Sequence, residues 1–121
     1  MRRSRVLLAA LAAVGALVAP AAAATPTINA NPNPVERGRT VRVHGIVPGC
    51  ARGNRVTLIS RAFSGRHRFA GVPAVFARVR AQHRYSVRTR IPATKRPGRY
   101  RITGRCGGGN LGVSTRLRVV R

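Results

Sequence analysis

The chain has 121 residues, of which 24 are Lys or Arg and one is acidic, giving a formal net charge of +23. This length allows one domain with a modest core beyond any targeting segment. Glu36 is the only side-chain carboxylate, which argues against acid–base hydrolysis because that chemistry needs positioned carboxylate, histidine or thiolate groups. We therefore expect a protein that is not an enzyme, with no catalytic residue and no cofactor.

Residues 1–24 have the pattern of a secretory signal peptide. A start with three arginines is followed by an apolar run over residues 6–18 and by four alanines at positions 21–24. Cleavage near Ala24 would leave residues 25–121 with a formal charge of +20, because three basic residues belong to the leader. The alternative is a retained membrane anchor, since the apolar segment is nearly long enough to span a bilayer. We expect a secreted or envelope-associated domain whose contact with the membrane is limited to this segment.

The rest of the chain has the alternation of β-strands. Apolar residues recur with a period of two, and Gly or Pro interrupts them about every eight to twelve residues, which predicts an antiparallel all-β domain without helices. About seven strands of this kind fit two sheets packed face to face. Residues 60–74 fit neither a strand nor a loop clearly. The predicted strands, in chain order, cover residues 27–30, 41–47, 55–58, 75–80, 84–91, 99–106 and 113–119.

Two segments resemble bacterial immunoglobulin-like domains of exported actinobacterial proteins. The first has a Pro-Val-x-x-Gly turn at residues 34–38 that leads into a Thr-Val-x-Val-x-Gly strand at residues 40–45. The second, residues 97–108, has a Pro-Gly-x-Tyr start to the penultimate strand and a Cys-Gly-Gly end. The resemblance covers essentially all of residues 25–121 and implies an immunoglobulin-like β-sandwich. It implies no particular activity, because this fold hosts many functions.

Cys50 and Cys106 are the only cysteines, and an even count in a small exported chain favours one disulfide. The bridge would close a loop of roughly 56 residues and stabilise the fold by about 4 kcal/mol on the chain-entropy model. It departs from the antibody pattern, because Cys50 follows a Pro-Gly turn and would pin one end of the sandwich. Tyr100 is expected to be largely buried, with its hydroxyl bonded to backbone in the preceding turn. The similar enediyne-binding apoproteins hold a small ligand at the loop end, but they carry two disulfides and acidic or neutral surfaces.

The arginines alternate with the core positions and are predicted to lie on the outer faces of the sheets. Such a positive field attracts polyanions, and Arg in place of Lys favours bidentate contact with phosphate or carboxylate. A compositional bias toward Arg is the alternative explanation, although bias does not explain the lack of Asp. We expect one outer face to carry Arg78, Arg80, Arg88 and Arg90 together with Arg42, and the other to carry Arg101, Arg105, Arg116 and Arg118.

The histidines His44, His67 and His83 lack the spacing of metal ligands, so no metal site is predicted. Aromatic residues for base stacking are scarce, so no specific nucleic-acid partner is expected. The sequence favours a secreted, non-catalytic binding or structural module at the cell envelope, whose partners are anionic envelope polymers or an acidic extracellular protein. The alternative is a secreted cationic effector that acts on anionic membranes or extracellular nucleic acid. Its oligomeric state is left open.

Overall fold

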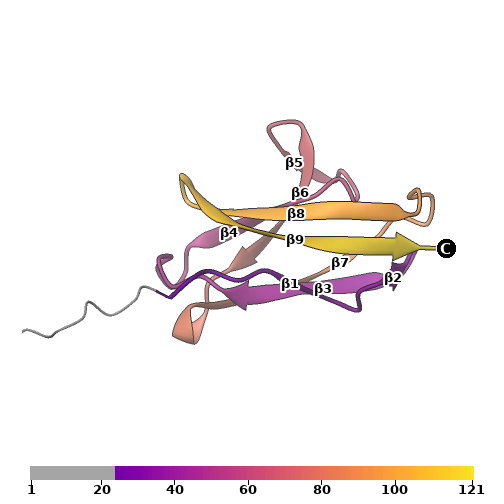
Figure 1. The fold of residues 1–121 in the computed structure, drawn as a ribbon. Helices are drawn as coiled ribbons and strands as arrows, with labels where there is room; N and C mark the ends of the chain where they lie inside the picture. The colour runs from indigo at the N-terminus through magenta and orange to yellow at the C-terminus, as the bar shows by residue number, and fades with distance from the viewer. Residues whose placement is uncertain (1–23) are drawn as a thin grey trace, which may run out of the picture.

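The computed structural model describes residues 24–121 and shows two β-sheets packed face to face (Figure 1). The predicted all-β sandwich is therefore confirmed, while the predicted signal peptide lies, apart from Ala24, outside the described residues. The part of the chain that is described has nine strands rather than seven, because β2 and β5 are too short to leave an alternating pattern in the sequence. The strands are β1 (Asn29–Asn31), β2 (Val35–Glu36), β3 (Thr40–Ile46), β4 (Arg55–Ile59), β5 (His67–Phe69), β6 (Val72–Arg78), β7 (Arg84–Arg90), β8 (Gly98–Cys106) and β9 (Gly109–Val120), with a 3-10 turn at Ala81–His83.

One sheet has the strand order β1-β3-β7, and the other has the order β2-β9-β8-β4-β6-β5. After β1 the chain crosses to the second sheet, where β2 pairs in parallel with the end of β9. The side chain of Asn33 extends this pairing. Its Nδ2 donates to the carbonyl of Arg116 at 2.8 Å, and its Oδ1 accepts from the amide of Arg118 at 2.9 Å. The amide thus pairs part of the β9 edge, which would otherwise be open to association with other chains.

The core consists of the alternate apolar positions of both sheets, as the sequence pattern indicates. Phe63 is 1% exposed and anchors the first part of residues 60–74, the segment that the alternation left undecided. Burial of such a ring stabilises the fold by about 1.5–3 kcal/mol. The core residues span Ile28 to Val119, so residues 25–121 contain the elements of the sandwich. Its most deeply buried side chains include Val41, Val43, Val56, Leu58, Tyr85, Ile91, Ile102, Leu117 and Val119.

The segment before β1 lies directly over Gly45 of β3. A Cβ atom at Gly45 would come within 2.0 Å of the carbonyl oxygen of Thr27, so only glycine allows this approach. The same oxygen accepts a hydrogen bond of 2.7 Å from the hydroxyl of Tyr85, whose ring is buried in the core. Burial raises the pKa of the Tyr85 phenol, which therefore remains a donor. Tyr85 is thus a buried polar anchor between the N-terminal segment and β7.

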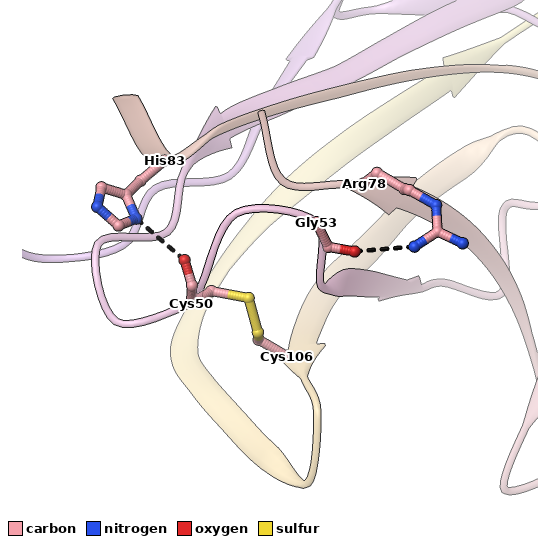
Figure 2. Close-up of a disulfide and its surroundings, with 5 residues drawn as sticks. All are labelled: Cys50, Gly53, Arg78, His83 and Cys106. Atoms are coloured by element: carbon pink, nitrogen blue, oxygen red, sulfur yellow. Dashed lines mark hydrogen bonds between the residues drawn. A yellow bond between two sulfur atoms is a disulfide. The ribbon is translucent and has the colours of Figure 1, made fainter. Parts of the chain in front are cut away.

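A disulfide joins Cys50 and Cys106, with the two Cα atoms 6.1 Å apart, as predicted (Figure 2). It ties the β3–β4 connection to the end of β8 and so pins one end of the sandwich. The Nδ1 of His83 donates to the carbonyl of Cys50 at 3.0 Å, and Arg78 donates to the carbonyl of Gly53 at 2.8 Å. These bonds hold the β3–β4 connection to β6 and to the 3-10 turn.

Candidate polyanion-binding surface

The outer face of β8 and β9 carries four arginines in two directly opposed pairs. Arg99 lies opposite Arg118, and Arg101 lies opposite Arg116. The alternation that sends Ile102 and the apolar residues of β9 into the core sends these four outward, and all four are exposed. Their side chains make no hydrogen bond or ion pair within residues 24–121. We call Arg99, Arg101, Arg116 and Arg118 the arginine quartet.

The same opposition recurs in two other places. Arg42 of β3 faces Arg88 of β7 on the outside of the three-stranded sheet. Arg55 of β4 faces Arg78 of β6 on the six-stranded sheet. Like charges directly opposite each other on a sheet destabilise it by roughly 0.2–1 kcal/mol per pair. Both outer faces therefore carry repulsion that a bound anion would relieve.

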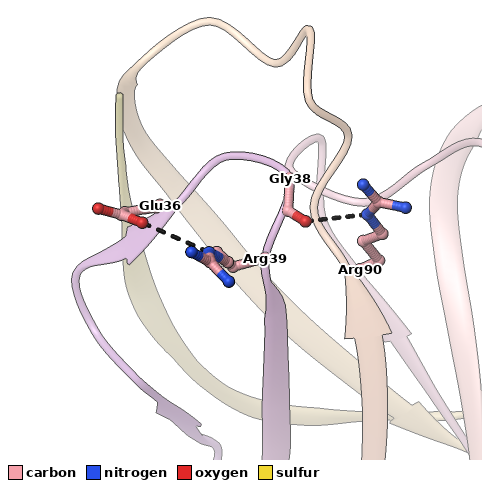
Figure 3. A network of polar contacts seen from close by, with 4 residues as sticks. All are labelled: Glu36, Gly38, Arg39 and Arg90. Carbon is pink, nitrogen blue, oxygen red and sulfur yellow. Dashed lines mark hydrogen bonds and ion pairs between the residues drawn. The ribbon is translucent and has the colours of Figure 1, made fainter.

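The chain itself offers almost no compensation for this charge. The single carboxylate side chain is that of Glu36 at the end of β2, and it lies 3.5 Å from Nε of Arg39, which precedes β3 (Figure 3). Both side chains are mostly exposed, so the pair contributes at most about 1 kcal/mol and is screened by salt. The positive field of the two faces therefore points to solvent.

Two of the predicted site residues lie elsewhere than expected. Arg78 is in β6 of the six-stranded sheet, not beside Arg88 and Arg90, because β6 pairs with β4 rather than with β7. Arg80 lies outside both sheets, in the connection that crosses from β6 to β7. The other predicted residues, Arg88, Arg90, Arg101, Arg105, Arg116 and Arg118, are in the expected sheets.

Three of the predicted residues use their guanidinium groups within the fold. Arg78 donates to the carbonyl of Gly53, and Nε of Arg90 donates to the carbonyl of Gly38 at 2.9 Å (Figure 3). Arg105 donates to the carbonyl of Gly108 and lies 5.0 Å over the ring of Phe69. These contacts shape loops and packing. The side chains without such partners among residues 24–121 are those of Arg80, Arg88, Arg101, Arg116 and Arg118.

A basic hollow that was missed in the sequence lies between the β4–β5 and β7–β8 connections, with a volume of about 680 Å³. Lys95, the only lysine in the chain, donates to the carbonyl of Arg61 at 2.7 Å and so joins the two connections. Tyr100 donates to the carbonyl of Arg96, as expected, but it is half-buried rather than largely buried because it lines this hollow. The sequence signal that could have pointed to this hollow was Lys95, as the single lysine among many arginines. The basic residues around the hollow are Arg61, Arg68, Lys95 and Arg96.

The three histidines are in separate places. His44 is on the outer face of β3, His67 lies against Phe76 at 5.2 Å between ring centroids, and His83 bonds to the Cys50 carbonyl. In the region covered by the structure, no three His, Cys, Asp or Glu side chains are grouped as metal ligands would be. Within residues 24–121 there is also no helix of the length and apolar character needed to cross a membrane.

Comparisons of this chain with protein-family models, with curated proteins and with solved structures found no match. The chemistry of the surface therefore has to be argued from its own residues. Guanidinium groups are permanent cations with planar forks of N–H donors and no acceptor. An array of them, facing solvent without carboxylates, can bind phosphate, sulfate or carboxylate groups.

Proposed function

We propose that this protein is a secreted, non-catalytic module of the cell envelope that binds anionic envelope polymers through the arginines on its outer faces. Teichoic acids and acidic polysaccharides have the required chemistry. The observation that carries the proposal is the set of opposed arginine pairs, above all the quartet on β8 and β9. A polymer lying across these strands would contact several guanidinium groups at once, and its charge would relieve their mutual repulsion.

The proposal includes an immunoglobulin-like assignment, which the strand order supports. Constant-type immunoglobulin domains place their first, second, fourth and fifth strands in one sheet and their third, sixth and seventh in the other. Strands β1, β3 and β7 match the first, second and fifth strands, and β4, β8 and β9 match the third, sixth and seventh. The fourth long strand, β6, departs from this pattern because it pairs with β4 in the second sheet. The Cys50–Cys106 bridge supports export, because disulfides persist in oxidising compartments.

The test uses purified cell walls before and after chemical removal of their anionic polymers. Residues 25–121 should bind to intact walls and should not bind to walls from which the anionic polymers have been removed. The double variant Arg116→Gln/Arg118→Gln should show reduced but not abolished retention, because binding is spread over many arginines. The matched control is Arg52→Gln/Arg66→Gln, which removes the same charge from exposed loop positions. Equal retention on stripped walls, or an equal loss in the control, would contradict the proposal.

A further inference from the structure

The outer face of the three-stranded sheet has a second basic hollow, with a volume of about 530 Å³. The basic residues that line it are Arg42 and His44 of β3, Arg84 of β7, and Arg80 of the β6–β7 connection. The phenol of Tyr85, which donates to the carbonyl of Thr27, also lines it. Three separate segments of the chain therefore bring their side chains to one place. The amide of Arg80 donates to the carbonyl of Arg84 at 2.7 Å, which fixes the connection against β7.

The strand register places the imidazole of His44 between guanidinium groups. His44 lies opposite Ser86, with Arg42 two residues away on its own strand and Arg84 two residues away from Ser86. Residues two apart share a face, and diagonal neighbours across strands are about 7–8 Å apart, within reach of long side chains. Nε of Arg42 donates to Oγ of Ser86 at 2.8 Å, so its two terminal NH₂ groups remain available to a ligand.

The hydrogen bond between Asn31 and His44 defines which nitrogen of the neutral imidazole carries the proton. Nδ2 of Asn31 lies 3.0 Å from Nε2 of His44. Because an amide NH₂ group donates, Nε2 accepts this bond, and the neutral imidazole carries its proton on Nδ1. A second proton on the ring would add a positive charge in the middle of the hollow.

Every charged group that faces His44 is positive. These groups are Arg42 on β3, Arg80 on the connection, and Arg84 and Arg88 on β7, while β1 contributes only the neutral Asn29 and Asn31. Partial burial and the Arg42 guanidinium lower the pKa of His44 from its usual value of 6.5. An anion in the hollow would have the opposite effect on the imidazole, because an opposite charge favours the protonated form.

We propose that this hollow binds a tetrahedral oxyanion of the phosphate or sulfate class, held by Arg42, Arg80 and Arg84, and that binding is coupled to proton uptake by His44. Convergence of three guanidinium groups favours a dianion with oxygens in several directions, whereas a planar carboxylate is satisfied by a single arginine fork. The inference deepens the proposed function and shares with it only the anionic character of the ligand. Because of the coupling, affinity should rise as pH falls.

Inorganic sulfate is the probe, because it keeps both charges across the pH range in which histidine titrates. The imidazole protons of residues 25–121 are followed by NMR at constant ionic strength, with sulfate replacing chloride. Sulfate should raise the pKa of His44 by about one unit, which corresponds to a tenfold higher affinity at acid than at alkaline pH. His67, on the other sheet, serves as the internal reference. Equal shifts of the two histidines would overturn the proposal, because they would show general screening.

Variants separate the anion contacts from the proton coupling. Arg84→Gln, at an exposed position, should weaken sulfate binding at every pH. His44→Asn should remove the pH dependence of sulfate binding. Binding by unaltered protein that does not vary with pH would overturn the coupling, and unchanged binding by Arg84→Gln would overturn the site.

Two further arms identify the source of the anion and separate this inference from the proposed function. Glycerol phosphate that binds as tightly as sulfate would indicate the end group of a polymer, whereas binding of sulfate alone would indicate a free ion. The quartet variant Arg116→Gln/Arg118→Gln should leave the sulfate response of His44 unchanged. Unaltered protein that shows this response but is not retained on cell walls would contradict only the proposed function. Unaltered protein that is retained but shows no response of His44 to sulfate would contradict only this site.

Discussion

Neutralising half of the arginine quartet should make the protein more stable and, at the same time, a weaker binder. In Arg116→Gln/Arg118→Gln each substitution removes a guanidinium group that faces another across the β8–β9 pair. Loss of two like-charge pairs should raise the free energy of unfolding by about 0.4–2 kcal/mol. The bonds from Asn33 to these strand positions use backbone atoms, so they remain in the variant.

The change in the salt dependence of binding can be estimated from counterion release. Each lost contact with a phosphate of the polymer should make the slope of log affinity against log salt less steep by about 0.7–0.9, so the loss of two contacts should make it less steep by about 1.4–1.8.

Urea denaturation at low salt measures the gain in stability. The gain should shrink at about 1 M salt, where charges are screened beyond about 3 Å.

The two effects together distinguish a binding surface from a structural one. If the quartet stabilised the fold, the variant would be less stable than the unaltered protein at low salt. If the quartet did not contact the polymer, the salt slope would be unchanged. Either result would refute the reasoning. The control Arg52→Gln/Arg66→Gln should gain less stability, because neither residue faces another arginine across a strand pair.

Three other predictions concern the fold. Replacing Cys50 and Cys106 with alanine should lower the free energy of unfolding by about 4 kcal/mol, and an unchanged urea midpoint would show that the bridge does not restrict the unfolded chain. Tyr85→Phe should lower the free energy of unfolding by about 1–3 kcal/mol, because it leaves the Thr27 carbonyl without its donor. An unchanged urea midpoint in this variant would contradict that role of Tyr85. Because the pKa of His44 is lowered in the folded state, the unfolded chain binds the proton more readily, and stability should fall as pH drops below 6.5. His44→Asn should remove this component, and a stability that rises toward acid pH in the unaltered protein relative to the variant would contradict it.

The sequence pattern was sufficient for the layers and for which side chains point outward. Strict alternation, as in Val41-Arg42-Val43, assigns one face to the core and the other to solvent whatever the neighbouring strand is. The pairing of strands is not contained in that alternation. Arg78 was therefore placed on the wrong sheet, since the partner of β6 depends on where the connection to β7 crosses the sandwich.

The loop sites could not be read from periodicity. The two basic hollows draw residues from connections, where positions such as Arg80 and Lys95 have no alternation to orient them. Phe63 lies in residues 60–74, which the alternation left undecided, because its burial depends on the fold of the whole β4–β5 connection. The polar role of Tyr85 was missed for a related reason, because its partner Thr27 lies far away in the sequence.

The most direct test of charge-driven binding is the affinity of residues 25–121 for one purified anionic wall polymer across a salt series. The series should run from about 0.01 M to about 1 M, over which the Debye length falls from about 30 Å to about 3 Å. The opposed arginine pairs require a linear and steep fall of log affinity with log salt. Binding that does not change with salt, or no binding even at the lowest concentration, would contradict the account.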